Sequence, residues 1–155
     1  MRDGRNVPIK RIDVSVYTVP TETPESDGTL EWGSTTLVLV RAFAADVMGL
    51  GYTYADNSTG VLIHDLLARI VEGRDVMAVA ACWEAMVRRT PNLGRPGIVS
   101  MAISAVDTAL WDLKARLLRL PLVDLLGSVR DRVPIYGSGG FTSYTNRQLE
   151  EQLGG

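Results

Sequence analysis

The sequence predicts an α+β fold, a three-stranded antiparallel sheet followed by a helical bundle. Three segments of strand character come before residue 55, and segments with helical spacing come after it. The longest of the helical segments, within residues 102–127, carries a stripe of apolar and small residues. Strands first and helices afterwards is the order of α+β domains, because an antiparallel sheet with one apolar face needs helices to cover it.

The composition fits a single core and excludes several classes of protein. A chain of 155 residues, 46% of them hydrophobic, can bury one substantial core. A net charge of −2 gives no electrostatic attraction to nucleic acid or to an anionic membrane. No apolar run reaches the roughly 18–20 residues of a membrane span, the N-terminus lacks the apolar segment of a secretory signal, and the single cysteine, Cys82, is expected in the core. We therefore expect a cytoplasmic protein that binds neither nucleic acid nor membranes.

The first strand is predicted over residues 9–18, where apolar and polar residues alternate. The apolar positions, which are expected to face the core, are Ile12, Val14 and Val16. Pro20 is expected to end the strand. Residues 21–34 are mostly polar and contain a proline and two glycines, so they are predicted to form a loop.

Two further strands are predicted over Thr35–Ala44 and Val47–Tyr54, joined by a hairpin turn at Ala45-Asp46. The third strand contains Gly49-x-Gly51, which does not extend to a dinucleotide-binding fingerprint. We attribute these glycines to the geometry of the strand.

Helices are predicted over residues 57–72 and 76–89. Asn57, Ser58 and Thr59 are the candidates to cap the first helix, and Gly73 lies beyond its end. The second helix is expected to stop before Pro91, and residues 91–97 are predicted to be a loop.

The next helix is the centre of the predicted fold. Its stripe repeats at helical spacing and consists of Ala102, Ala105, Val106, Ala109, Leu113 and Leu117. Because three of these six residues are alanines, another element can approach the stripe closely. Asp112 and Arg116 stand four residues apart in the favourable order for a surface ion pair. Pro121 is expected to end the helix, and a short apolar turn then closes on Gly127.

The last segment of the chain has the pattern of one incomplete βα unit. An apolar run at Val133–Tyr136 is followed by glycines, and Thr145 or Asn146 can cap a further helix. A lone strand of parallel type with one short helix cannot bury itself. We therefore expect residues 130–155 to be the beginning of a larger, truncated element.

The exact residues of 102–127 carry a resemblance. Their order is Ala-x-Ser-Ala-Val-Asp-x-Ala-Leu-x-Asp-Leu-x-Ala-Arg, four residues, then Pro-Leu-x-x-Leu-Leu-Gly. This order resembles the first signature of the mandelate racemase/muconate lactonizing enzyme family, which belongs to the enolase superfamily. The resemblance implies an enolase-like N-terminal capping domain over residues 1–129. It also implies that residues 130–155 are the first βα unit of a C-terminal (β/α) barrel, with its first strand at Val133–Ser138.

The resemblance also implies a reaction. Family members abstract the proton α to a carboxylate, and a Mg²⁺ ion held by three acidic residues stabilises the resulting enediolate. The acids lie on the third to fifth barrel strands, the lysine base on the second and a histidine–aspartate pair on later strands. All of these would follow Gly155, so we expect this chain to contain no catalytic residue and no metal ligand, and to be inactive by itself.

The function implied is that of a sugar-acid dehydratase, with a small carboxylate substrate and assembly into a homo-oligomer. A racemase or epimerase of α-hydroxy acids is the nearest alternative. A non-enzymatic α+β binding module is a third reading, if the natural protein ends at residue 155.

Four residues are candidates for substrate binding. In relatives, the loops after the first and third strands fold over the barrel mouth, and here they correspond to residues 21–34 and 52–58. Large amphipathic side chains in these loops, Trp32, Tyr52 and Tyr54, suit the lining of such a site, although local packing explains them equally well. Ser138 would lie at the end of the first barrel strand, where barrel active sites form. Many relatives carry an acid where Tyr52 follows Gly51, so the role of that acid is not expected here.

Other polar residues are assigned structural positions. His64, the only histidine, is expected on the surface or between helices, and Lys114 is expected to be solvated. Asp107 and Asp112 are expected to form structural hydrogen bonds or ion pairs. The acidic residues of the first predicted loop lack regular metal-ligand spacing and are expected to be solvated: Glu22, Glu25, Asp27 and Glu31.

Overall fold

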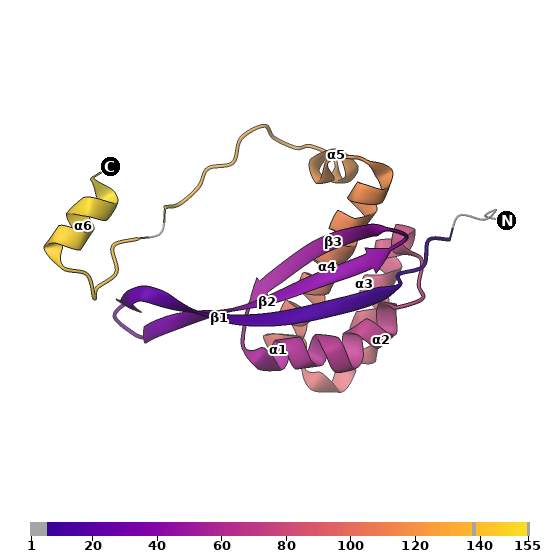
Figure 1. Ribbon diagram of the computed structural model, residues 1–155, viewed down its shortest axis with the longest axis horizontal. Coiled ribbons are helices and arrows are strands. Elements are labelled where there is room, and N and C mark those ends of the chain that lie inside the picture. Colours follow the sequence, from indigo (N-terminus) through magenta and orange to yellow (C-terminus); the bar gives the residue numbers. More distant parts are fainter. Residues whose placement is uncertain (1–5, 138, 155) are drawn as a thin grey trace. The chain divides into compact units, whose positions relative to one another are not determined.

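The computed structural model describes residues 6–137 and 139–154 and divides into two compact units. The first, which we call the sheet–helix unit, comprises residues 1–17 and 36–127. The second, the hairpin unit, comprises residues 18–35 and 128–155. Figure 1 shows the elements of both units.

The predicted sheet is present, with strands β1 (Arg11–Ser26), β2 (Glu31–Ala44) and β3 (Val47–Tyr54) in the order β1-β2-β3. β2 and β3 are antiparallel, with Leu37 opposite Tyr54 and Phe43 opposite Met48. The turn between them lies at residues 45–46, where Ala45 adopts a left-handed φ of 49°. The three strands and this turn confirm the sheet predicted from the alternating pattern.

The prediction of a loop over residues 21–34 is wrong. β1 continues past Pro20 to Ser26, and β2 already begins at Glu31, so that residues 27–30 alone connect the two strands. β1 is an edge strand of the sheet. A proline is tolerated on an edge strand, because the N–H that it lacks need not contribute to the ladder.

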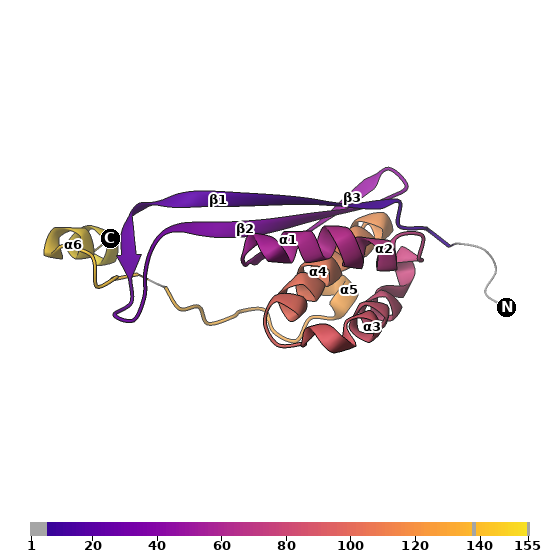
Figure 2. The ribbon, with the colours of Figure 1, turned by 90° about the horizontal axis from the view of Figure 1, so that it is seen from below.

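The helices follow the strands in the predicted order. They are α1 (Asn57–Leu62), a π-helical segment (Ile63–Leu67), α2 (Ala68–Val71), a 3₁₀ turn (Val76–Ala78), α3 (Val79–Arg89), a second 3₁₀ turn (Pro91–Leu93), α4 (Ile98–Leu118), α5 (Leu122–Leu126) and α6 (Asn146–Leu153). Within the sheet–helix unit, Figure 2 shows α1 to α4 on one side of the sheet.

The first helix is capped by Asp56, whose carboxylate accepts a hydrogen bond from the Ser58 N–H at 2.9 Å. The prediction of a cap at residues 57–59 is therefore wrong, because the extended backbone that a cap requires lies one residue earlier.

The core lies between the sheet and the helices that cover it, and α4 contributes the largest set of buried residues. Alternate β2 residues Val38, Val40, Ala42 and Ala44 are fully buried. From α4, the whole predicted stripe except the half-buried Leu117 is buried: Ala102, Ala105, Val106, Ala109 and Leu113. Cys82 on α3 belongs to this core, as expected, and burial raises the pKa of its thiol.

The two glycines of β3 set the distance between β3 and α4. A Cβ at Gly49 would overlap the carbonyl oxygen of Ala109, and a Cβ at Gly51 would overlap the carbonyl oxygen of Ala105. The strand backbone thus lies directly on the alanines of the helix. The expectation that another element approaches this stripe closely is confirmed, and that element is β3.

Asp112 on α4 makes two bonds to different parts of the fold. Its Oδ2 accepts a hydrogen bond from the backbone N–H of Leu50 in β3 at 2.8 Å, and the Nε of Arg116 donates to the same oxygen at 2.7 Å. The predicted pair of Asp112 and Arg116 is confirmed. β3 is the other edge strand of the sheet. Asp112 therefore also accepts a hydrogen bond from an N–H that an edge strand would otherwise leave without a partner.

Lys114 is not solvated, which corrects the prediction from the sequence. Its ammonium group donates a hydrogen bond to the carbonyl oxygen of Met77 at 2.9 Å and lies 5.0 Å from the centre of the Trp111 ring. The side chain is half-buried, because its long aliphatic stem lies along the helix while its charge binds a carbonyl of the 3₁₀ turn before α3.

In the hairpin unit, the described residues of Val133–Ser138 form no strand. Ile135 and Tyr136 are 92% and 91% exposed. A strand of parallel type needs neighbours for its backbone hydrogen bonds and its apolar side chains, and none pairs with residues 133–137 among the described residues. α6 is formed as predicted, with a capping box between Thr145 and Gln148. The division of the chain at residue 129 into a capping domain and a barrel remains a prediction.

Substitution of Gly51 by alanine is expected to lower the free energy of unfolding by about 1–3 kcal/mol, because the new methyl group forces β3 away from α4. Urea denaturation followed by circular dichroism measures the change. Gly33→Ala is the matched control, since no atom lies within 4 Å of a Cβ at Gly33, and its effect should stay within about 0.5 kcal/mol. Equal effects of the two substitutions would contradict the close packing of β3 on α4.

Asp112→Ala is expected to lower the free energy of unfolding by about 1.5–3 kcal/mol, because it removes the charged acceptor of the Leu50 N–H. Arg116→Ala removes only an exposed ion pair and should cost about 0.5 kcal/mol or less. The same denaturation experiment compares them. A cost of Arg116→Ala as large as that of Asp112→Ala would show that the ion pair, and not the bond to β3, is the stabilising contact.

Candidate functional site

The tip of the β1–β2 hairpin is organised by Asp27. Its Oδ1 accepts hydrogen bonds from the Thr29 hydroxyl at 2.6 Å and from the backbone N–H groups of Thr29 and Leu30 at 2.9 and 3.0 Å. The Thr29 hydroxyl, followed by these backbone groups, lowers the pKa of Asp27 to about 2. Gly28 supplies the φ of +91° that the turn requires. The tip is therefore a fixed turn, and Asp27 is engaged within it.

Trp32 is held by contacts inside the hairpin unit. Its indole N–H donates to Glu25 Oε2 at 2.8 Å. Its ring packs edge-to-face on Phe141, with the ring centroids 5.6 Å apart, and Phe141 packs in the same way on Tyr144 at 5.4 Å. The hydroxyl groups of Ser26 and Thr142, 2.6 Å apart, join the same two segments. Local packing, which the sequence left open as an explanation for Trp32, is thus present.

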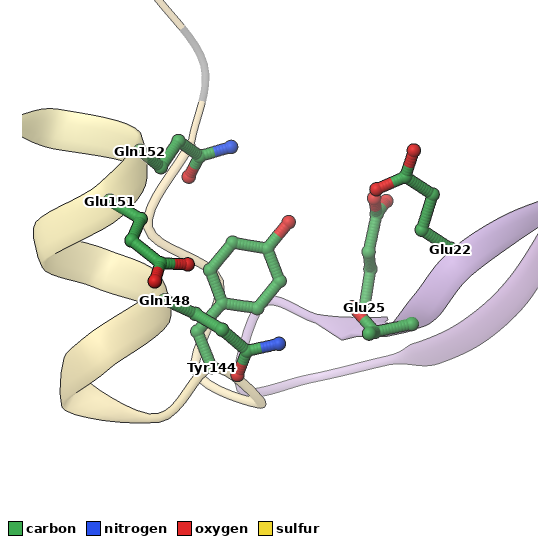
Figure 3. Close-up of a pocket in the computed structure, with 7 residues that line it drawn as sticks. Glu22, Glu25, Tyr144, Gln148, Glu151 and Gln152 are labelled. Carbon is green, nitrogen blue, oxygen red and sulfur yellow. The ribbon is translucent and has the colours of Figure 1, made fainter. Parts of the chain in front are cut away.

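A polar hollow of about 360 Å³ lies beside this aromatic cluster (Figure 3). Its lining residues are Glu22, Thr23, Glu25, Tyr144, Gln148, Glu151 and Gln152. Figure 3 shows Tyr144 between the side chains of α6 and the acidic side chains of the hairpin. Carboxylates, amides and a phenol can exchange hydrogen bonds with a hydroxylated molecule, whereas the acidic side chains disfavour an anionic group in the same space.

The α6 side of this hollow was not predicted from the sequence. Gln148 and Gln152 lie on α6 four residues apart, the spacing that places side chains on one face of a helix, and Tyr144 precedes this helix. That spacing was the available signal. Glu22 and Glu25 were predicted to be solvated loop residues, but both lie on β1, where Glu25 is half-buried and bound to Trp32.

Tyr52 and Tyr54 lie together in the sheet–helix unit. Both project from β3 on the sheet face opposite Gly49 and Gly51, and they are 57% and 63% exposed. Their rings meet edge-to-face with the centroids 6.0 Å apart. Trp32 belongs to the other unit, and Ser138 lies outside the described residues, so the structure brings together two of the four candidate substrate-binding residues.

Two further residues singled out from the sequence are placed by the structure. His64 lies exposed in the π-helical segment, with its Nδ1 2.8 Å from Asp65 Oδ1, so the expected surface position is confirmed. Asp107 is half-buried on α4, and burial raises the pKa of its carboxyl group, while a hydrogen bond with Trp111 acts in the opposite direction. Asp107 also lines a small hollow of about 170 Å³ beside Trp83 and Arg95.

Residues 6–137 and 139–154 do not fit a Mg²⁺ site, since nowhere among them do three His, Cys, Asp or Glu side chains gather in a way that could hold a metal ion. Over the same ranges, no helix combines the length and the apolar character needed to cross a membrane. The arrangement found is therefore a polar, partly acidic surface on a hairpin, with no metal centre of its own among the described residues.

Comparison with known proteins identifies the domain. A family model described as "Mandelate racemase / muconate lactonizing enzyme, N-terminal domain" matches residues 11–127. A mandelate racemase/muconate lactonizing enzyme-like protein from Rubrobacter xylanophilus, known from its crystal structure, is 56% identical and superposes with a TM-score of 0.91 over 95% of this chain and 41% of its own.

Curated relatives carry out different reactions. L-rhamnonate dehydratase of Saccharopolyspora erythraea is 39% identical over 68% of this chain and 27% of its own length. 3,6-anhydro-α-L-galactonate cycloisomerase of Streptomyces coelicolor is 35% identical over 84% of this chain and 38% of its own. The chain thus spans less than half the length of these relatives. Solved structures of further relatives contain bound magnesium, and one of them also holds L-glucarate.

Proposed function

Because this chain belongs to the mandelate racemase/muconate lactonizing enzyme family of the enolase superfamily, we propose that it is the N-terminal part of a Mg²⁺-dependent enzyme that dehydrates a sugar acid. Two findings support this choice. Sugar-acid dehydratases are among the relatives, and magnesium is bound in solved structures of similar proteins. The proposal gives the chain the role of a cap that encloses the substrate, while the reacting groups lie elsewhere in the enzyme.

The hollow of the hairpin unit is the observation that most supports a hydroxylated substrate. Its lining offers the hydroxyl of Tyr144 and the amide NH₂ groups of Gln148 and Gln152, which suit sugar hydroxyl groups. The oxygens of these two amides already accept hydrogen bonds from Thr145 and from the Gly140 N–H. The carboxylates of Glu22 and Glu25 would repel the carboxylate of a sugar acid. The proposed orientation therefore places the hydroxyl end of the substrate toward the hairpin and its carboxylate away from it.

The proposed reaction is the elimination of one water molecule from the substrate. A base removes the proton α to the carboxylate, the hydroxyl group on the adjacent carbon leaves with a proton as water, and the resulting enol tautomerises to a 2-oxo acid. A magnesium ion would supply charge stabilisation at the substrate carboxylate. No group of the described residues could hold that ion. The proposed role of these residues is therefore limited to binding the substrate and excluding water.

Two other functions remain as alternatives. A racemase or epimerase would begin with the same proton abstraction, and the cycloisomerase among the relatives shows that related proteins differ in reaction. A non-enzymatic binding module is the alternative from another class. It is favoured if the natural gene product is no longer than this chain.

Four residues are proposed to contact the substrate: Trp32, Tyr52, Tyr54 and Ser138. Trp32 is the best supported, because its bond to Glu25 joins it to a residue that lines the hollow. Tyr52 and Tyr54 present exposed phenol groups on β3. We also propose that the enzyme is cytoplasmic and assembles into a homo-oligomer.

The natural gene product that contains this chain is expected to convert L-rhamnonate or galactarate to a 2-oxo-3-deoxy acid, measured as its semicarbazone. Removal of divalent metal with EDTA should abolish turnover, and Mg²⁺ should restore it. The 155-residue chain alone is expected to be inactive in the same assay. Metal-dependent interconversion of α-hydroxy acid stereoisomers without dehydration would favour the racemase, and turnover by the isolated chain would contradict its assignment as a cap.

Trp32→Phe in the same gene product is expected to raise KM for the sugar acid about five- to tenfold with a smaller effect on kcat, because the loss of about 1 kcal/mol of binding corresponds to such a change. The substitution removes the indole N–H that holds Glu25 but retains a ring against Phe141. Trp83→Phe on α3 is the matched control and should leave KM unchanged. An unchanged KM in Trp32→Phe would remove Trp32 from the proposed substrate site.

A further inference from the structure

A second hollow, of about 320 Å³, lies in the sheet–helix unit and is rich in arginine. Its lining residues come from the π-helical segment, α2, the turn after α2 and the end of α3: Asp65, Leu66, Arg69, Ile70, Arg74 and Arg89. Three of these six residues are cations and one is an acid. None of the residues proposed above to contact a substrate belongs to this hollow.

The three guanidinium groups lack carboxylate partners among the described residues. The six ion pairs found there involve other cations. The one acid of the hollow, Asp65, already lies 2.8 Å from His64 Nδ1. The Nε of Arg74 donates to the carbonyl oxygen of Ile70 at 2.6 Å, which fixes the side chain near the helix and leaves its two terminal nitrogens available.

Helix ends explain part of this charge but not all of it. Arg69 and Arg89 lie in the last turns of α2 and α3, where cations interact favourably with the negative end of a helix. Each helix end carries only about half a negative charge. Two such ends and Asp65 therefore leave an excess of positive charge beside three guanidinium groups, on a chain whose net charge is −2.

The chemistry of the hollow defines the ligand class. Guanidinium groups present parallel N–H donors that match the oxygens of carboxylates and phosphates. A volume of about 320 Å³ is at the lower end of the range for small-molecule sites, and the half-buried Leu66 and Ile70 provide an apolar wall. We propose that this hollow binds a small dianion, a phosphate monoester or a dicarboxylate.

The experiment is a titration of the ¹⁵N-labelled 155-residue chain, monitored by NMR at constant ionic strength. The probes are inorganic phosphate and succinate, with chloride as the monovalent reference. Saturable shifts are expected for the amides of residues 65–74 and 88–90. The double variant Arg69→Ala/Arg89→Ala should weaken binding at least tenfold.

Arg88→Ala is the matched control. Arg88 is the neighbour of Arg89 and carries the same charge, but it is paired with Glu84 at 2.6 Å and does not line this hollow. Binding retained in Arg88→Ala and lost in the double variant supports the site, and tighter binding of phosphate or of succinate identifies which dianion it takes.

Two results would overturn the proposal. One is the absence of saturable shifts with either probe. The other is an equal loss of affinity in Arg88→Ala, Arg69→Ala and Arg89→Ala, which would mean that binding depends only on the overall charge of the chain. Circular dichroism of each variant confirms that it is folded. Because the arginines are exposed, these substitutions leave the core intact.

Discussion

The contact on which the rest of the fold depends is that between the backbone of β3 and the alanines of α4. Gly49 and Gly51 have no side chain, so the backbone of β3 meets α4 directly at Ala105, Ala109 and Leu113. The backbones of strand and helix can then pack directly on each other, which fixes the position of α4 beneath the sheet. The helices that cover the rest of the sheet are in turn placed against α4.

The side chains of α4 and those of the hairpin unit differ in how closely they are tied to the core. Signature residues of α4 have structural partners, as Asp112 does with the N–H of Leu50 in the edge strand. The hairpin unit is held by exposed hydrogen bonds and by one cluster of aromatic rings, Trp32, Phe141 and Tyr144. Side chains there can change without disturbing the core of the sheet–helix unit.

The sequence predicted those features that depend on local periodicity. The strands, the buried stripe of α4 and the Thr145 cap follow from spacing and residue type alone. Features that depend on partners distant in sequence were missed. Pro20 does not end β1, because β1 is an edge strand. Lys114 binds Met77, which is 37 residues away. Residues 133–137 have strand composition, but no strand pairs with them among the described residues, and composition cannot supply a neighbour.

Charge is distributed unevenly over the chain, although its net value is small. The hollow of the hairpin unit carries acidic groups, whereas the hollow between α2 and α3 carries three guanidinium groups. An anion therefore meets repulsion in the first and attraction in the second. In the proposed orientation, a sugar acid approaches the hairpin with its hydroxyl groups foremost and its carboxylate directed away from the hairpin. Under the function proposed above, the acidic hairpin would therefore favour one orientation of the substrate.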